Sequence, residues 1–250
     1  MKIPWIFPGE RLPPADSAWG VNDPVPGLLA AGGALDVESL KSAYESAAFP
    51  WFNDDQPILW WSPDPRMILS TDAFVLHRSL RKKLQRFRDD LNCEIRMDHD
   101  FERVIKACSL APREGQSGTW IVSQIVAAYC DFHRSGFAHS VETWVNGELV
   151  GGLYCVGIGR AVFGESMFAR TTDASKIALA ALICFCLRNG ISLIDCQQNT
   201  KHLASLGATE LTRTHFASHV GRASAEPAPI WRFEPVYWNE LLPKLHSQTT

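Results

Sequence analysis

A carboxylate and a carboxamide stand two residues apart in an apolar segment, Leu193-Ile194-Asp195-Cys196-Gln197. In an extended strand this spacing places Asp195 and Gln197 on one face, with Cys196 pointing the other way into the core. A buried carboxylate that orients a neighbouring carboxamide could position a nucleophile, because the amide oxygen accepts a hydrogen bond from the nucleophile. From these residues alone, a structural polar pair that bonds backbone groups is the favoured alternative.

A second carboxylate, Glu165, is framed by large apolar side chains in Phe163-Gly164-Glu165-Ser166-Met167-Phe168, directly after a predicted strand. A carboxylate among such neighbours is costly unless it has a partner. It is therefore either a functional group or half of a structural ion pair, and the residues alone favour neither.

The elements that must position these side chains alternate along the second half of the chain. Asn146-Gly147 predicts a two-residue hairpin turn. Asp173 is a candidate N-cap for a helix that Asn189-Gly190 ends, and this helix leads into the strand of Asp195. Strand, crossover helix and strand imply a partly parallel sheet, and the hairpin makes it mixed. Strands are expected over 138–145, 148–152 and 161–163, and helices over 119–133 and 174–188.

The first 65 residues have a different composition, with ten of the fifteen prolines and five of the nine tryptophans. They predict a small, irregular α/β domain in which one helix runs from an Asp36 cap to Ala47. Two prolines interrupt regular structure in Trp60-Trp61-Ser62-Pro63-Asp64-Pro65-Arg66. We therefore expect an α+β protein with domains over 1–65 and 66–250.

A segment with six basic residues and no acid follows, from His77 to Arg88. Leu80, Leu84 and Phe87 recur at helical spacing and should face inward, which leaves the basic side chains exposed. Taken alone, the segment favours a solvated helix face over a phosphate-binding surface. The basic residues are Arg78, Arg81, Lys82, Lys83, Arg86 and Arg88.

The composition limits the classes of function. A net charge of −3 gives no global field toward a polyanion, so any nucleic-acid contact must be a local patch. The seven cysteines include no C-x-x-C pair, so neither a metal site nor a disulfide framework is indicated. The longest apolar run, Ile177 to Leu187, is too short to span a bilayer, and we expect a cytoplasmic protein.

Several blocks of the chain, in this order, resemble the leucyl/phenylalanyl-tRNA–protein transferase family over roughly residues 24 to 216. Each block alone would be weak, but the ordered set is specific. The blocks are Phe49-Pro50-Trp51-Phe52, Trp60 to Arg66, Gly118-Thr119-Trp120-Ile121, Ala138-His139-Ser140-Val141-Glu142, Leu149-Val150-Gly151-Gly152-Leu153-Tyr154, Gly164-Glu165-Ser166-Met167-Phe168, Ala174-Ser175-Lys176 and Ile194-Asp195-Cys196-Gln197.

The resemblance implies a small N-terminal domain followed by a GNAT-like acyltransferase domain. It implies transfer of leucine or phenylalanine, with methionine as a third candidate, from aminoacyl-tRNA to a protein that begins with arginine or lysine. The product would be an N-terminal degradation signal. No metal or small cofactor is implied, and we expect a monomer without a membrane partner.

The resemblance also implies roles for the polar residues. Gln197 would accept a hydrogen bond from the attacking amine, Asp195 would orient Gln197, and Glu165 would engage the incoming ammonium group or its cationic side chain. The terminal adenine would stack on Trp51 or Trp120, and the basic residues of 77–88 would follow tRNA phosphates. The aminoacyl pocket or its rim would comprise Tyr44, Trp51, Trp120, Leu153, Val162, Ser166 and Met167.

Three other functions remain to be compared. An acetyl-CoA enzyme on the same fold needs Gln or Arg three positions before a glycine of its pyrophosphate loop, and none of the seventeen glycines has one. A non-catalytic RNA-binding module leaves Glu165, Asp195 and Gln197 without purpose. A transferase that builds another product from aminoacyl-tRNA, such as a cell-wall peptide bridge, is disfavoured by the ordered blocks.

Overall fold

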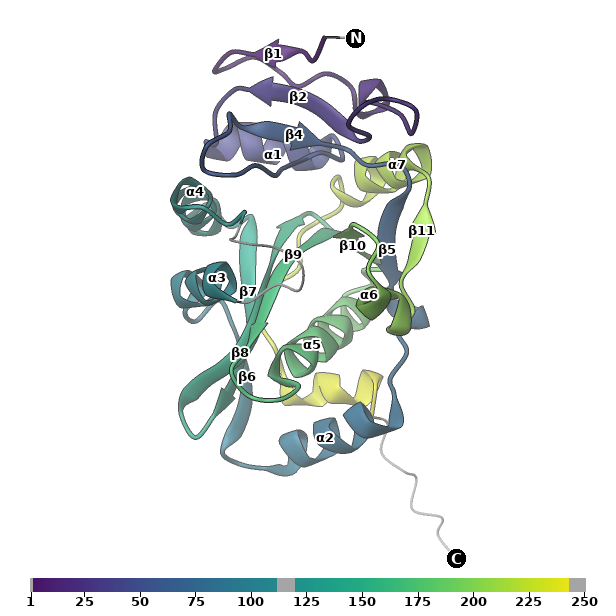
Figure 1. Ribbon diagram of the computed structural model, residues 1–250. Helices are drawn as coiled ribbons and strands as arrows, with labels where there is room; N and C mark the ends of the chain where they lie inside the picture. Colours follow the sequence, from purple (N-terminus) through teal and green to yellow (C-terminus); the bar gives the residue numbers. More distant parts are fainter. Residues whose placement is uncertain (1, 112–119, 243–250) are drawn as a thin grey trace, which may run out of the picture.

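The computed structural model describes residues 2–111 and 120–242, and two sheets organise this part of the chain (Figure 1). The smaller sheet has the order β1-β2-β4-β3, and helix α1 lies beside it. Its elements are β1 (Trp5–Ile6), β2 (Leu28–Gly32), α1 (Val37–Glu45), β3 (Phe49–Pro50) and β4 (Leu59–Trp61).

The larger sheet has the order β11-β5-β10-β9-β8-β7-β6. The pair β9 and β10 is parallel and is joined by helix α5, whereas the other neighbouring strands are antiparallel. The expectation of a mixed sheet in an α+β fold is thus confirmed. The strands are β5 (Arg66–Ser70), β6 (Cys93–Met97), β7 (Ala138–Val145), β8 (Glu148–Ile158), β9 (Ala161–Ala169), β10 (Leu193–Gln197) and β11 (Thr209–Leu211).

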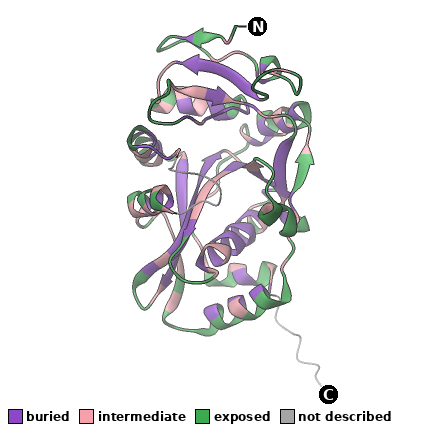
Figure 2. Ribbon diagram, in the orientation of Figure 1, coloured by how far each residue is buried: buried purple, intermediate pink, exposed green. Residues whose placement is uncertain are grey.

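Helices cover both faces of the larger sheet, and successive residues of a strand point to opposite faces. Tyr154 and Phe163 pack toward α1, α3 and α4, whereas Leu153 and Val162 pack toward α5 and α2. Helix α5 is buried along most of its length because it is apolar all round (Figure 2). The helices are α2 (Arg78–Asp89), α3 (Phe101–Leu110), α4 (Ser123–Arg134), α5 (Ala174–Arg188), α6 (Lys201–Ser205) and α7 (Arg213–Ala223).

The strongest local patterns predict their elements well. Helix α5 and strand β7 have the expected bounds, and Asn146 and Gly147 adopt the positive φ values, 52° and 77°, of a tight hairpin turn. Strands β8 and β9 extend beyond the expected 148–152 and 161–163. Gly157 and Gly164 lie inside them, where Trp231 and the backbone of Asp195 pack closely against the chain, and do not end the strands. Helix α4 begins at Ser123 rather than Thr119, which lies outside the described residues.

The first helix is also shorter than predicted. Asp36 caps α1 by accepting a hydrogen bond from Ser39, as expected, but the helix ends at Glu45. Ala47 then takes the left-handed conformation with φ 59°, which turns the chain toward β3. Residues on either side of the predicted boundary at 65 and 66 belong to different sheets, and the division into domains at this point stays a prediction.

Candidate active site

The candidate site lies where β9 and β10 separate. Their last paired residues are Phe163 and Asp195; beyond them β10 ends at Gln197 and β9 continues to Ala169. A Cβ on Gly164 would lie 3.2 Å from the Asp195 carbonyl oxygen, so glycine lets the strands approach closely just before they diverge. The divergence leaves space between two neighbouring strands of one sheet.

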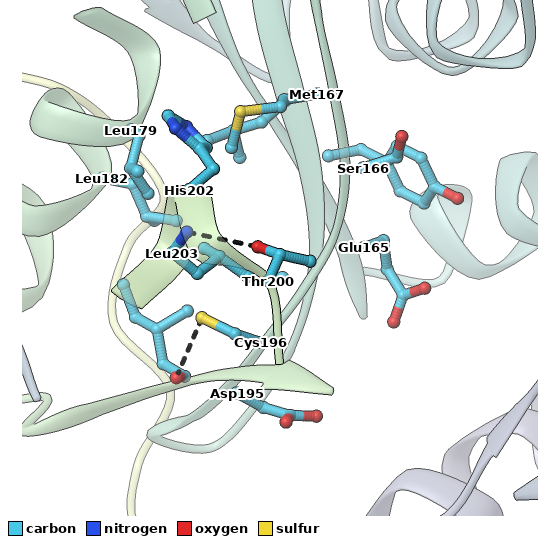
Figure 3. Close-up of a pocket in the computed structure, with 14 residues that line it drawn as sticks. Glu165, Ser166, Met167, Leu179, Leu182, Asp195, Cys196, Thr200, His202 and Leu203 are labelled. Atoms are coloured by element: carbon cyan, nitrogen blue, oxygen red, sulfur yellow. Dashed lines mark hydrogen bonds between the residues drawn. The ribbon is translucent and has the colours of Figure 1, made fainter. Parts of the chain in front are cut away.

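A cavity of about 290 Å³ occupies this space (Figure 3). Leu179 and Leu182 of α5 lie on one side of it, and Glu165 lies on the opposite side. The cavity therefore has an apolar wall and an acidic end, which suits a ligand with an apolar side chain next to a polar centre. Its lining comprises Leu153, Tyr154, Gly164, Glu165, Ser166, Met167, Leu179, Leu182, Ile194, Asp195, Cys196, Thr200, His202 and Leu203.

Glu165 has one occupied carboxylate oxygen and one without a partner. Its Oε1 accepts a hydrogen bond of 2.6 Å from the Tyr44 hydroxyl and one of 2.9 Å from Nε2 of Gln197. Its Oε2 is buried and has no hydrogen-bond partner among the described residues. Because buried polar atoms are nearly always satisfied, Oε2 is positioned for a group that the protein itself does not supply.

Burial raises the pKa of Glu165 to about 8, against an ordinary value of 4.5. The Tyr44 hydrogen bond opposes this rise, and the negative charge of Asp195 adds to it. Near neutral pH the carboxyl group therefore carries a proton for much of the time. Since Oε1 already accepts two hydrogen bonds, this proton resides on Oε2.

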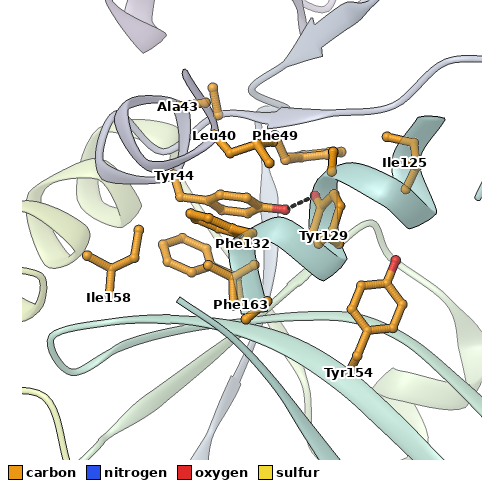
Figure 4. Close-up of a cluster of buried hydrophobic side chains, with 14 of the residues drawn as sticks. Leu40, Ala43, Tyr44, Phe49, Ile125, Tyr129, Phe132, Tyr154, Ile158 and Phe163 are labelled. Carbon is orange, nitrogen blue, oxygen red and sulfur yellow. Dashed lines mark hydrogen bonds between the residues drawn. The ribbon is translucent and has the colours of Figure 1, made fainter. Parts of the chain in front are cut away.

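Two tyrosines connect Glu165 to the core between the sheets. Tyr44 of α1 and Tyr129 of α4 share a hydrogen bond between their hydroxyls, and Tyr44 also packs on Phe163 at 5.0 Å (Figure 4). Burial and the nearby charge of Glu165 raise the pKa of both phenols well above the usual value. Because each hydroxyl has one proton, Tyr129 donates to Tyr44 and Tyr44 donates to Glu165.

Asp195 and Gln197 do not lie side by side as they would in a regular strand. The strand bulges between them, and Gln197 has φ 62°, so the bulge and not regular alternation sets the direction of its side chain. The hydrogen bond between the two residues joins Oδ1 of Asp195 to the backbone N–H of Gln197 at 2.8 Å. The carboxylate of Asp195 also accepts two hydrogen bonds from Arg66, from Nε to Oδ1 at 2.8 Å and from Nη2 to Oδ2 at 2.6 Å.

The structure places the predicted pocket residues in different settings. Leu153, Ser166 and Met167 line the cavity, and Tyr44 reaches its edge through Glu165. Val162 was predicted for the pocket but is 2% exposed in the core toward α5.

Two predicted aromatic residues also lie outside the described lining of the cavity. Trp51 packs on Trp61 at 5.4 Å, and Trp120 is half-buried next to residues 112–119, which lie outside the described part. Cys196, expected in the core, is half-buried and lines the cavity. Burial raises the pKa of its thiol to about 12, so it is no nucleophile at neutral pH.

Sequence reasoning missed Arg66, Tyr129 and most of the apolar wall. Arg66 stands directly before the apolar Met67-Ile68-Leu69. An arginine at the start of a buried strand needs an acidic partner, and this pattern could have identified Arg66 from the sequence. Tyr129 had no signal, because its importance comes from a contact with Tyr44, 85 positions away. The missed cavity residues include Leu179, Leu182 and Leu203.

The predicted basic helix exists as α2, and Leu80, Leu84 and Phe87 are buried as expected. Three of its basic residues bind the protein itself. Lys83 forms an ion pair with Asp173, Arg88 with Asp89, and Arg81 donates to the Leu241 carbonyl. Asp173 also pairs with Lys176, at 2.8 Å, instead of capping α5 with its side chain as predicted.

The other three basic residues of α2 are Arg78, Lys82 and Arg86, at i, i+4 and i+8. They are exposed, and within the described ranges no ion pair involves them. They form a row on the side of α2 that faces away from the core. No helix in the described part of the chain is long and apolar enough to cross a membrane.

Two family models match the chain. The leucyl/phenylalanyl-tRNA protein transferase model matches residues 68–221, and the model of the N-terminal domain of the same transferase matches residues 33–64. These matches include β9, β10 and α1, which supply Glu165, Gln197 and Tyr44.

Similar proteins span nearly the full chain, and each is named leucyl/phenylalanyl-tRNA–protein transferase. One from Polaromonas sp. is 62% identical over 240 residues, which cover 96% of this chain and 94% of that protein. One from Albidiferax ferrireducens is 57% identical with the same coverage. One from Burkholderia vietnamiensis is 53% identical over 93% of this chain and 91% of that protein. The chain therefore belongs to the leucyl/phenylalanyl-tRNA–protein transferase family, a family of enzymes.

Proposed function

We propose that this chain transfers leucine or phenylalanine, and also methionine, from aminoacyl-tRNA to the α-amine of proteins that begin with arginine or lysine. The observation that carries the proposal is the cavity whose apolar wall ends at the hydrogen-bonded Glu165 and Gln197. The apolar side chain of leucine, phenylalanine or methionine would fill the space beside Leu179 and Leu182. The ester carbonyl would then lie near the polar end.

The proposed chemistry needs positioning more than a strong base. An aminoacyl ester is already activated, so a neutral amine held against its carbonyl carbon can attack without a covalent enzyme intermediate. The new C–N bond forms as the bond between the carbonyl carbon and the ribose oxygen breaks. The proton that the amine loses ends on the ribose hydroxyl, which leaves with the tRNA.

The hydrogen bonds support a division of roles. The Gln197 amide nitrogen already donates to Glu165, so its oxygen is the atom that would accept a hydrogen bond from the amine. When Glu165 is ionised, its Oε2 would take a proton from the incoming ammonium group. A pKa of about 8 for Glu165 is close to that of an α-amino group, about 7.7–8.0, so this transfer is nearly balanced.

The preference for arginine or lysine and the role of the product as a degradation signal rest on the family resemblance. An acidic residue at the end of the cavity is compatible with a cationic acceptor. The test incubates the protein with labelled Leu-tRNA, Phe-tRNA or Met-tRNA and peptides that begin with Arg, Lys or Ala. Label on the Arg and Lys peptides only is the expected result, and no label on any peptide would refute the proposal.

A further inference from the structure

Arg66, at the start of β5, is a buried cation next to the candidate site. Its side chain and that of Asp195 are both 0% exposed, and the guanidinium donates to both carboxylate oxygens. The guanidinium also lies 4.7 Å from the centre of the Phe49 ring and 4.6 Å from that of Phe216. The plane and the position of Arg66 are therefore fixed by two hydrogen bonds and two aromatic rings.

Stability alone does not account for this pair. Removing two charges from water is costly for each ion, and a well-packed apolar replacement of a buried pair is often neutral or stabilising. The relevant question is what the pair holds in place. Asp195 makes one further bond, from its Oδ1 to the backbone N–H of Gln197.

That third bond acts on a strained residue. Gln197 is not glycine, yet its φ is 62°, a strained conformation that persists only where neighbours hold it. The left-handed conformation follows the bulge at the end of β10 and directs the Gln197 amide to Glu165 at 2.9 Å. A carboxylate free to rotate would hold this backbone less well.

We propose that Arg66 is a positioning residue for the transfer reaction, acting through Asp195 to hold the backbone of Gln197 in the bulge that aims its amide at Glu165. The inference deepens the function proposed above and rests on it. Arg66 does not reach the amide of Gln197, and Asp195 needs no role as a base. The structure shows three hydrogen bonds to the Asp195 carboxylate: two come from Arg66 and one from the backbone N–H of Gln197.

The small N-terminal sheet takes part in this arrangement. Phe49, one of the two rings against the guanidinium, belongs to β3 of that sheet. Nη1 of Arg66 also points to the carbonyl oxygen of Ala47, at 3.4 Å. The small sheet thus supplies one of the two rings against the guanidinium, and helix α7 supplies the other, Phe216. Packing between the two sheets consequently influences the geometry of Gln197.

The first test replaces Arg66 with lysine, which keeps the charge and loses the planar fork. We expect kcat for transfer of Phe from Phe-tRNA to an Arg-initiated peptide to fall by about 10- to 100-fold, as small misplacements of reacting groups do. The KM values for Phe-tRNA and for the peptide should stay within about threefold, because neither substrate touches Arg66.

The matched control is Arg213→Lys. Arg213 is also buried and also connects the two parts of the chain, through Nη1 to the Ala18 carbonyl at 3.0 Å, but it contacts neither Asp195 nor Gln197 in the described structure. Arg213→Lys should lower the melting temperature and leave kcat unchanged below it. If Arg66→Lys behaves in the same way, Arg66 is only a structural residue and the inference is wrong.

A double-mutant cycle provides the second test and covers the case in which Arg66→Lys fails to fold. Arg66→Gln with Asp195→Asn removes both charges and leaves none buried alone. If Arg66 acts through Asp195, the double variant should be no slower than the slower single variant, since the effects are not additive. Independent, multiplicative losses would overturn the inference. Absence of transfer by the unmodified protein would instead refute the proposed function, which separates the two failures.

Discussion

Glu165 responds to pH in a direction that follows from its burial. Its pKa is about 8 in the folded protein and near 4.5 in an unfolded chain. Between these two values the folded protein holds a proton that the unfolded chain has released. The free energy of unfolding therefore decreases as pH rises from about 4.5 to about 8, and this residue's effect is constant outside that window.

Glu165→Gln should remove this dependence. Relative to the unmodified protein, the variant should gain stability between pH 5 and pH 8 by at most about 1.4 kcal/mol for each pH unit. Urea unfolding of both proteins at several pH values measures the difference. Glu38→Gln, at an exposed acid of α1, is the control for the loss of one carboxylate. A difference independent of pH for Glu165→Gln would contradict the raised pKa.

Gln197 and its neighbour Gln198 allow a matched comparison. Gln197 is half-buried and bonds Glu165, whereas Gln198 is exposed. Gln197→Ala should lower kcat for transfer by about 10²–10³-fold, the loss typical of one preorganised polar contact, and leave aminoacyl-tRNA binding unchanged. Gln198→Ala should change neither quantity. Steady-state transfer assays and tRNA binding measure both, and equal kcat values for the two variants would show that Gln197 makes no specific contribution to the reaction.

At the scale of elements, the close packing of α5 on β8 positions one wall of the cavity. A Cβ on Gly151 of β8 would lie 2.5 Å from Cβ of Ala174, the first residue of α5. Only glycine allows the helix to lie this close, and the same helix carries Leu179 and Leu182 to the cavity. The position of α5, and with it the depth of the cavity, depends on this missing side chain.

Gly151→Ala should therefore destabilise the protein by about 1–3 kcal/mol, the usual cost of overpacking. It should also raise the KM for Phe-tRNA more than that for the peptide, because the displaced helix shifts Leu179 and Leu182, which line the cavity. Gly221→Ala is a control of opposite sign: Gly221 lies in α7 with no atom near its Cβ position, so alanine should stabilise by about 0.5–1 kcal/mol. Thermal unfolding and steady-state kinetics measure both. An unchanged melting temperature for Gly151→Ala would contradict the tight contact.

For the whole molecule, the net charge of −3 leaves tRNA binding to local patches, and α2 carries the clearest one. Arg78, Lys82 and Arg86 are the exposed basic residues of this helix with no ion pair within the described ranges. We predict that Lys82→Ala and Arg86→Ala each weaken tRNA binding and lower the salt dependence of log K by about one unit of slope. Binding measured at several salt concentrations gives this slope.

Lys106 provides the control for the charge effect. It lies on α3 and pairs with Glu102, away from the row on α2. Lys106→Ala removes one positive charge, as Lys82→Ala does. It should leave the salt slope of tRNA binding unchanged. Equal effects of the two substitutions would show that net charge, and not the row on α2, governs binding.

The sequence alone determined those elements that depend on neighbouring residues. The bounds of α5 and β7 follow from an apolar helix with a glycine stop and from a hairpin turn of Asn146 and Gly147. The mixed α+β sheet follows from the order of these elements. The ordered sequence blocks also carried the family resemblance, because each block keeps residue types at fixed positions.

Only the tertiary structure decided how the polar residues meet. Glu165, Tyr44 and Tyr129 come from a strand and two helices, and no local pattern couples positions so far apart. The chain entropy lost in bringing them together is offset by burial across the whole core, so their contacts depend on the complete fold. The sequence identified Asp195 and Gln197 as a pair, whereas the structure showed that Arg66 and a strand bulge set their geometry.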